Sequence, residues 1–217
     1  KVHFIGLLSD GGVHSHIQHL KGLITAASER GLKDLYIHAF TDGRDTDPKG
    51  GLGYMSDLEE HLAHHGGAVA TVVGRYFAMD RDKRWERVRK AYDLMVKGEG
   101  EAFTSAKDCL EANYDRGITD EFIEPGIINS NGLIAEDDVV ICFNFRTDRG
   151  RQITMALNQQ DFPEQGMKKL DLHYVTMTRY DDTFKGVKVI YEKDNLSDTL
   201  GEVISKAGKT QVRIAET

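Results

Sequence analysis

The chain opens with Val2-His3-Phe4-Ile5-Gly6-Leu7-Leu8, an almost unbroken apolar run that is followed at once by Ser9-Asp10-Gly11-Gly12. A strand that is buried on both faces shows such a continuous run, whereas a strand with one face in water alternates apolar and polar residues. Strands of the first kind belong to parallel sheets that helices cover on both sides. The opening stretch therefore predicts an α/β fold with a polar, glycine-containing loop at the carboxyl end of its first strand.

The rest of the chain repeats this pattern of short apolar runs and amphipathic stretches. Residues 17–30 have helical spacing, since Leu20, Ile24 and Ala27 recur every three or four positions. Further strands are expected at residues 35–40, 68–73, 139–144, 172–177, 187–191 and 211–215, and further helices at residues 53–65, 82–97, 105–115, 149–158 and 198–207. We predict a single α/β domain over residues 1–217, a mostly parallel sheet covered by helices on both faces.

The composition excludes several classes of protein. Hydrophobic residues make up 40% and charged residues 29% of the 217 residues, which allows a core and excludes a disordered chain. No apolar run reaches the ~18–20 residues that a membrane span needs. The formal net charge is −7, so we do not expect the chain to bind nucleic acid non-specifically. The two cysteines, Cys109 and Cys142, are too few for a disulfide scaffold and favour the reducing cytoplasm.

The two ends of the sequence carry a further expectation. No initiator Met precedes Lys1, and residues 211–215 alternate like a strand just before the end at Thr217. Natural termini more often carry polar, poorly ordered residues. We therefore expect the chain to be a piece of a longer protein.

Arginine is concentrated in the segments that follow the predicted strands, where open parallel sheets bind their ligands. The segments at residues 41–48, 74–82 and 144–151 together contain Arg44, Arg75, Arg81, Arg146, Arg149 and Arg151. A guanidinium group binds carboxylate or phosphate oxygens with paired donors, which a lysine cannot do. Several guanidinium groups at one sheet edge predict a small polyanionic ligand, such as a phosphate ester that also carries a carboxylate.

The same arginines have a second interpretation, in which they form surface ion pairs with aspartates of these segments. Those aspartates are Asp42, Asp45, Asp80, Asp82 and Asp148. Arg84, Arg87 and Arg89 differ from the loop arginines, because the predicted helix over residues 82–97 places them with Glu86 on a solvated face or in intrahelical ion pairs.

The loop after the first strand brings Asp10, His14 and His16 close together. One interpretation is a metal-dependent hydrolase that uses these three side chains, since imidazole binds divalent zinc or iron, although no second cluster of comparable quality follows along the chain. In another interpretation His14 donates a hydrogen bond to the anion. A third is a structural hydrogen bond at the start of the following helix.

Asp45 is the carboxylate that we expect to act as an acid–base catalyst. It follows Arg44 in a turn among the arginines, where a positioned carboxylate can accept a hydroxyl proton. A role as a helix cap suits Asp47 better, because Pro48 follows it.

Four segments occur in order along the chain: LSDGGVHSH at residues 8–16, TDGRDT at 41–46, GRYFAMDRD at 74–82 and NFRTDR at 144–149. Together they resemble the cofactor-independent (2,3-bisphosphoglycerate-independent) phosphoglycerate mutases, and the resemblance extends from residue 2 to residues 213–217. That family interconverts 3-phosphoglycerate and 2-phosphoglycerate in glycolysis and gluconeogenesis. It combines an alkaline-phosphatase-like domain, which holds two manganese ions and a phosphorylated serine, with an inserted phosphotransferase domain that holds the glycerate.

The resemblance implies that this chain is the phosphotransferase domain alone, excised from a two-domain enzyme and lacking the phosphatase-like metal domain. It implies that the substrate-binding residues are His14, Arg44, Asp45, Arg75, Arg81, Arg146 and Arg149. Asp45 would exchange the proton of the glycerate hydroxyl, and both manganese ions would be bound by the absent domain, with none in this chain. The implied partners are phosphoglycerate and that missing domain, and the isolated chain would be inactive. A stand-alone module that binds small anions is the alternative function.

Overall fold

The computed structural model describes residues 1–192 and 196–214, and its strands form one sheet in the order β4-β5-β3-β2-β1-β6-β7-β8. The strands are β1 Val2–Leu8, β2 Leu35–Thr41, β3 Ala68–Gly74, β4 Glu101–Ala102, β5 Gly126–Ile127, β6 Val139–Cys142, β7 His173–Thr178 and β8 Lys188–Tyr191. The pair β3–β5 is antiparallel and the other neighbouring pairs are parallel. The predicted α/β fold with a mostly parallel sheet is therefore confirmed.

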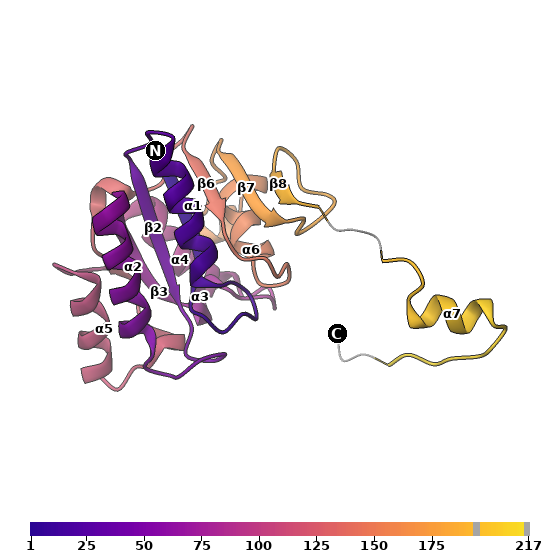
Figure 1. Ribbon diagram of the computed structural model, residues 1–217. Coiled ribbons are helices and arrows are strands. Elements are labelled where there is room, and N and C mark those ends of the chain that lie inside the picture. The colour runs from indigo at the N-terminus through magenta and orange to yellow at the C-terminus, as the bar shows by residue number, and fades with distance from the viewer. Residues whose placement is uncertain (193–195, 215–217) are drawn as a thin grey trace.

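Helices lie on both faces of this sheet (Figure 1). They are α1 Ile17–Glu29, α2 Gly51–His65, α3 Arg75–Ala78, α4 Trp85–Lys97, α5 Ala106–Asp115, α6 Arg151–Thr154 and α7 Leu200–Lys206, and a π-helical turn at Met155–Gln159 continues α6. None of the helices in the described parts of the chain combines the length and the apolar character that crossing a membrane requires.

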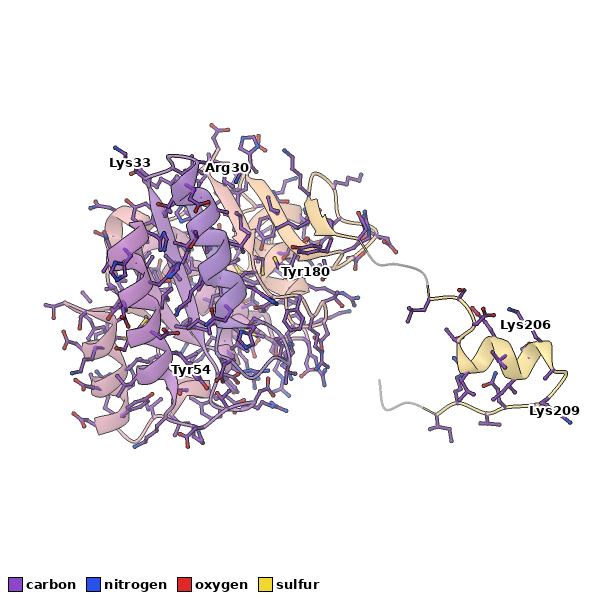
Figure 2. The ribbon with its side chains drawn as sticks, viewed as in Figure 1. Arg30, Lys33, Tyr54, Tyr180, Lys206 and Lys209 are labelled. Carbon is purple, nitrogen blue, oxygen red and sulfur yellow. The ribbon has the colours of Figure 1, made fainter. Side chains whose placement is uncertain are left out.

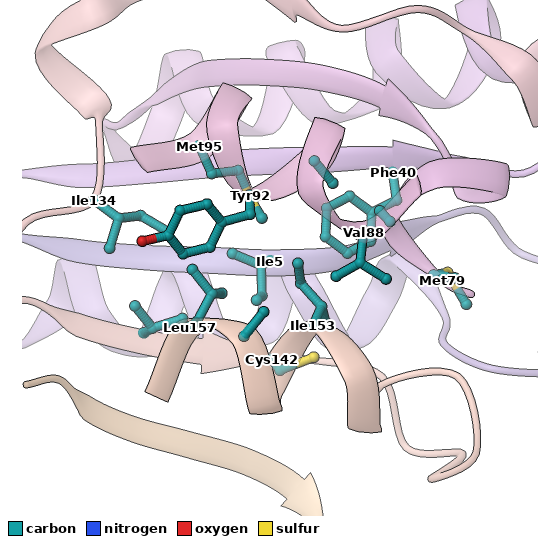
Figure 3. Close-up of a cluster of buried hydrophobic side chains, with 14 of the residues drawn as sticks. Ile5, Phe40, Met79, Val88, Tyr92, Met95, Ile134, Cys142, Ile153 and Leu157 are labelled. Atoms are coloured by element: carbon teal, nitrogen blue, oxygen red, sulfur yellow. The ribbon is translucent and has the colours of Figure 1, made fainter. Parts of the chain in front are cut away.

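Two hydrophobic clusters, one on each face of the sheet, explain the unbroken apolar run at the start of the chain. Ile5 and Leu7 of β1 pack into the cluster that α4 and α6 cover, part of which is drawn in Figure 3. Phe4 and Leu8 of the same strand pack into the cluster that α1, α2 and α5 cover. Because successive side chains of a strand point to opposite faces, both sets of positions in β1 must be apolar.

The start of α4 lies at Trp85, three residues beyond the expected start at residue 82, because Asp80 holds the preceding segment as a loop. The Asp80 carboxylate accepts hydrogen bonds from the backbone N–H groups of Asp82 and Arg84, each at 2.9 Å. Between them Lys83 has a φ of 59°, in the left-handed region that a right-handed helix excludes. The loop that carries Arg81 is thus fixed by a buried carboxylate.

The strand β6 ends at Cys142, two residues before the expected end, and the side chain of Asn144 continues its pairing with β1. Asn144 Oδ1 accepts a hydrogen bond from the Leu7 N–H at 2.9 Å. A Cβ at position 6 would lie 2.8 Å from that oxygen, so only glycine fits at Gly6.

The C-terminal part of the chain corrects one expectation. Residues 211–214 are not a strand, and Ala215, the last residue of the predicted strand, lies outside the described residues. A strand needs a neighbouring strand for its backbone hydrogen bonds, and none lies beside residues 211–214 within the described chain. Figure 1 shows α7 apart from the sheet, and its side chains Leu200 and Val203 are exposed.

A buried chain of polar side chains crosses the sheet from the start of β1 to the middle of β2 and β3. His3 Nδ1 lies 3.0 Å from His38 Nε2, and His38 Nδ1 lies 2.8 Å from Thr71 Oγ1. His3 Nε2 contacts Asp138 Oδ2 at 3.1 Å. Burial lowers the pKa of His3 to about 4, against the effect of Asp138, and burial also lowers the pKa of His38. Both imidazoles are therefore neutral near pH 7.

These histidines predict a loss of stability in mild acid. Below the ordinary histidine pKa of 6.5 the unfolded chain takes up protons that folded His3 does not bind until about pH 4. The free energy of unfolding should therefore fall as pH is lowered through this window, with His3 alone contributing about 3 kcal/mol. Urea denaturation at pH values between 7 and 4 measures this dependence.

The substitution His3→Gln should lower stability at pH 7 and make its pH dependence shallower. The exposed His64→Gln variant is the matched control and should keep the full pH dependence. Equal pH dependence in the wild type and His3→Gln would contradict the prediction.

Candidate functional site

The loops that carry the predicted site residues leave four adjacent strands, β3, β2, β1 and β6, at their carboxyl ends. In Figure 2 the label Tyr54 lies at this edge of the sheet, and the labels Arg30 and Lys33 lie at the opposite edge. The Tyr54 hydroxyl donates a hydrogen bond to Asp10 Oδ1 at 2.5 Å. Strands β2 and β6 pair with β1 on its two opposite sides, so the order in which successive strands are added to the sheet changes direction at β1. In open α/β sheets the ligand crevice lies at such a reversal.

Asp42, the first residue after β2, connects three of these loops. Its Oδ2 accepts a hydrogen bond from Ser9 Oγ at 2.7 Å, and its Oδ1 accepts from Arg75 Nη1 at 2.7 Å and from the Asp45 N–H at 2.9 Å. Burial opposes ionisation of this carboxyl, but the hydrogen bonds from Asp45, Ser9 and Arg75 outweigh burial and lower the pKa of Asp42. Asp42 is therefore a charged group inside the protein, and it fixes the turn that carries Arg44 and Asp45.

Arg75 begins α3 directly after β3 and joins Asp42 to Asp45. Its side chain is 3% exposed and that of Asp42 is 2% exposed, so this ion pair is buried. The same Nη1 donates to Asp45 Oδ2 at 2.5 Å. The Asp45 carboxylate is thereby held at the surface of the site, where it is still 19% exposed.

His14 lies between two carboxylates. Its Nε2 is 3.8 Å from Asp45 Oδ2 and its Nδ1 is 3.7 Å from Asp148 Oδ1. Burial, together with the positive charges of Arg75 and Arg146, lowers the pKa of His14 to about 4 against the opposing charges of Asp148 and Asp45. The imidazole is therefore neutral near pH 7 and has one N–H to donate.

Arg81 and Arg146 share one carboxylate, Asp148, on the other side of His14. Arg81 Nη1 and Arg146 Nη2 each lie 3.0 Å from Asp148 Oδ2. Arg81 comes from the loop after β3 and Arg146 from the loop after β6, so Asp148 joins these two loops.

Arg149 differs from the other arginines of the site. It donates from Nη1 to the Met79 carbonyl at 3.0 Å, and within residues 1–192 and 196–214 no carboxylate lies within ion-pair distance of it. Burial and the charges of Arg75, Arg81 and Arg44 lower the pKa of Arg149. Three positive neighbours therefore repel its charge, and the opposing charge of Asp148 lies beyond ion-pair distance.

A cavity of about 230 Å³ is lined by Arg44, Arg75 and Arg149, and also by two arginines that we expected on a solvated helix face, Arg84 and Arg87. Arg87 lies 3.8 Å above the ring of Tyr76 and 3.8 Å from Asp80 Oδ1. Arg84 is exposed, as expected, although it precedes α4. The expectation is wrong for Arg87, which is half-buried and pairs with Asp80 outside α4. Arg89 forms the expected kind of intrahelical pair, with Asp93 one helical turn away.

Three other side chains that the sequence singled out have separate partners. Arg151 donates from Nε to the Tyr180 carbonyl at 2.7 Å. His16 caps α1, because its Nδ1 accepts from the Gln18 N–H at 3.2 Å, and Asp10 accepts from Tyr54. The structure thus does not bring Asp10, His14 and His16 into a metal site, and no group of three His, Cys, Asp or Glu side chains in the described residues has the arrangement of one.

Sequence reasoning named the arginines but gave no individual role to three aspartates that organise them, Asp42, Asp80 and Asp148. Each of them follows a strand within six residues and precedes a site arginine by one or two residues, and this spacing is a signal in the sequence. The two interpretations of the arginines are also compatible, because Arg75, Arg81 and Arg146 come together at one edge and pair with aspartates there. The Arg75–Asp42 pair is buried rather than on the surface.

The buried position of Asp42 predicts that its removal is costly. Asp42→Ala leaves Arg75 without its main partner inside the protein, so we expect a loss of about 3–5 kcal/mol in the free energy of unfolding. Glu111→Ala is the matched control, because it removes a carboxylate from an exposed pair with Lys107 on α5 and should cost about 0.5 kcal/mol or less. Urea denaturation of both variants tests this, and equal losses would contradict it.

The chain is similar to known proteins over its whole length. The family model described as BPG-independent PGAM N-terminus matches residues 1–182. The 2,3-bisphosphoglycerate-independent phosphoglycerate mutase of Flavobacterium johnsoniae is 59% identical over 100% of this chain and 44% of its own length. The enzyme of the same name from Clostridium novyi is 54% identical over 100% of this chain and 43% of its own length. The chain thus spans less than half the length of these relatives.

A solved structure agrees with these relatives. The phosphoglycerate mutase of Leishmania mexicana, crystallised at low cobalt concentration, is 31% identical and superposes with a TM-score of 0.83, covering 95% of this chain and 41% of that one. The family match, the relatives and this structural similarity, together with the four segments that form the site, lead to one conclusion: the chain belongs to the family of BPG-independent phosphoglycerate mutase N-terminal domains.

Proposed function

We propose that this chain is the phosphotransferase domain of a longer, two-domain phosphoglycerate mutase, which interconverts 3-phosphoglycerate and 2-phosphoglycerate in the cytoplasm. In this proposal residues 1–217 hold the glycerate, and a phosphatase-like domain outside the chain supplies a phosphoserine. The relatives carry the name of this activity, and they are more than twice as long as the chain.

The observation that carries the proposal is the unbalanced charge of Arg149. A half-buried guanidinium group that faces Arg44, Arg75 and Arg81 and lacks a carboxylate partner within the described chain favours a bound anion. Phosphoglycerate has a phosphoryl group and a carboxylate, and two clusters of arginines are present for them. Arg44, Arg75 and Arg149 line one cavity, while Arg81 and Arg146 lie beside Asp148.

Asp45 is the residue that we assign to proton transfer. Arg75 Nη1 donates to its Oδ2 at 2.5 Å, and this charge-assisted contact orients the carboxylate. It accepts the proton of the glycerate hydroxyl when that oxygen attacks the phosphoryl group, and it returns the proton when the phosphoryl group leaves. We assign neutral His14, which lies beside Asp45 at the site and has one N–H to donate, to the substrate-binding residues.

The nucleophile belongs to the other domain in this proposal, because the serines at the site already have structural partners. Ser9 Oγ donates to Asp42 at 2.7 Å, and Ser15 Oγ donates to the Leu7 carbonyl at 2.5 Å. Both side chains are buried. We likewise assign the two manganese ions to the other domain, where they would supply Lewis-acid chemistry at the phosphoserine; the described residues of this chain include no group of three His, Cys, Asp or Glu side chains that could hold a metal ion.

The first test is binding of 3-phosphoglycerate to this chain by calorimetric titration. Arg149→Gln removes the charge that lacks a partner, so we expect the dissociation constant to rise about 10- to 100-fold with an unchanged melting temperature. Arg151→Gln is the matched control, because Arg151 follows two residues later but donates to the Tyr180 carbonyl. Equal affinity of Arg149→Gln and the wild type would refute the proposed site.

The second test is activity. The purified chain, supplied with manganese and 3-phosphoglycerate, should form no 2-phosphoglycerate by phosphorus NMR, because it lacks the nucleophile. The full-length enzyme of Flavobacterium johnsoniae serves as the positive control. Clear turnover by the chain alone would overturn the proposal that the nucleophile belongs to the other domain.

A further inference from the structure

The Asp148 carboxylate lies where an anionic ligand would contact Arg81 and Arg146. Its Oδ2 lies 3.0 Å from both Arg81 Nη1 and Arg146 Nη2, and its Oδ1 faces His14 Nδ1 at 3.7 Å. Two guanidinium groups and one imidazole from three different loops therefore point at one internal carboxylate. Burial of Asp148 is outweighed by Arg81, Arg146 and His14, so the pKa of Asp148 is lowered and the group is charged.

The ion pairs of the site fall into two kinds. Arg75 and Asp42 are 3% and 2% exposed, so neither partner can leave the other for a ligand. Arg81, Arg146 and Asp148 are 36%, 45% and 26% exposed, and such partly solvated pairs contribute little stability. An ion pair of this second kind can be exchanged for contacts with a ligand.

Two atoms without partners indicate where the Asp148 carboxylate moves in this exchange. Asp148 Oδ1 and His14 Nδ1 are both buried, and neither has a hydrogen-bond partner among the described residues. They face each other across 3.7 Å, which is longer than a hydrogen bond. A small rotation of Asp148 away from the arginines and toward His14 brings the two atoms together and satisfies both.

We propose that Asp148 is an internal competitor of the substrate: its carboxylate holds Arg81 and Arg146 in the empty site, and an anionic oxygen of the ligand displaces it onto His14 Nδ1. This inference rests on the proposed function, because it requires that the site binds phosphoglycerate. A ligand must bind the two guanidinium groups better than a carboxylate does. A phosphoryl group has a charge of about −1.5 to −2 near pH 7 and meets that requirement.

The exchange has two consequences for the site. The empty site keeps its arginines oriented and partly neutralised, so less reorganisation is needed when the ligand binds. The bound site has Asp148 hydrogen-bonded to His14 Nδ1–H, which leaves His14 Nε2 unprotonated on the side of Asp45. Asp148 is thus an affinity-determining residue, and it also selects the tautomer of His14.

Calorimetric titration of the chain with 3-phosphoglycerate at fixed ionic strength tests the competition. We expect Asp148→Asn to bind about tenfold more tightly than the wild type, because the ligand no longer has to replace two ion pairs. Glu86→Gln is the matched control: Glu86 is an exposed carboxylate in the first turn of α4, and no salt bridge to it is present in the described residues. Its affinity should change less than twofold, which measures the general effect of removing one negative charge.

A second measurement on the wild type does not depend on the folding of a variant. Long-range ¹H–¹⁵N NMR of His14 should report a neutral ring that becomes hydrogen-bonded at Nδ1–H when 3-phosphoglycerate is added, and this change should be absent in Asp148→Asn. Equal or weaker binding by Asp148→Asn, or a His14 signal that the ligand does not alter, overturns the inference while phosphoglycerate binding stands. A wild type that does not bind 3-phosphoglycerate refutes the proposed function itself, and the competition with it.

Discussion

The buried ion pair between Arg75 and Asp42 is the interaction on which the site depends. Asp42 is the first residue after β2, and Arg75 is the first residue after β3. The Asp42 carboxylate also accepts a hydrogen bond from Ser9, which follows β1. A pair of this kind is expensive to desolvate, and it stabilises a fold only when its geometry is good and its remaining oxygens are hydrogen-bonded. Asp42 meets this condition because the N–H groups of residues 44 and 45 also donate to it. The pair therefore fixes three strand ends and places the Asp45 carboxylate at the surface of the site.

From this fixed pair outward, the ion pairs become more exposed and more easily exchanged. Asp45 is partly exposed and keeps one contact with Arg75, and Asp148 binds arginines that are more exposed still. Arg149 has three arginine neighbours, and no carboxylate of the described residues lies within ion-pair distance of it. In an acidic chain with a net charge of −7, this arrangement concentrates positive potential at one sheet edge. The rigid pairs hold the shape of the site, and the exposed ones leave room for a ligand.

The architecture was predictable from the sequence because its signals are local. Buried strands are continuous apolar runs, and helices such as α1 have regular apolar spacing, so the strand–helix order follows from the residues. Other features depend on contacts between distant segments. The two-residue strands β4 and β5 are too short to form a pattern, and the loop before α4 exists because Asp80 binds two backbone N–H groups. The arginines of the site were identifiable by residue type and position after a strand. Their division into fixed and exchangeable pairs was not, because burial of Asp42 and partial exposure of Asp148 come from packing.

The same packing bears on the proposed division of the activity between two domains. Phosphoryl transfer requires a nucleophile as well as an anion site, and the two serines at the site, Ser9 and Ser15, donate to Asp42 and to the Leu7 carbonyl. Freeing Ser9 would remove a donor from the carboxylate that orients Arg75 and Asp45. The contacts that orient Asp45 and Arg75 therefore occupy the serine hydroxyl groups. This agrees with the proposed function, in which binding and nucleophilic attack are supplied by separate domains and the glycerate is held between them.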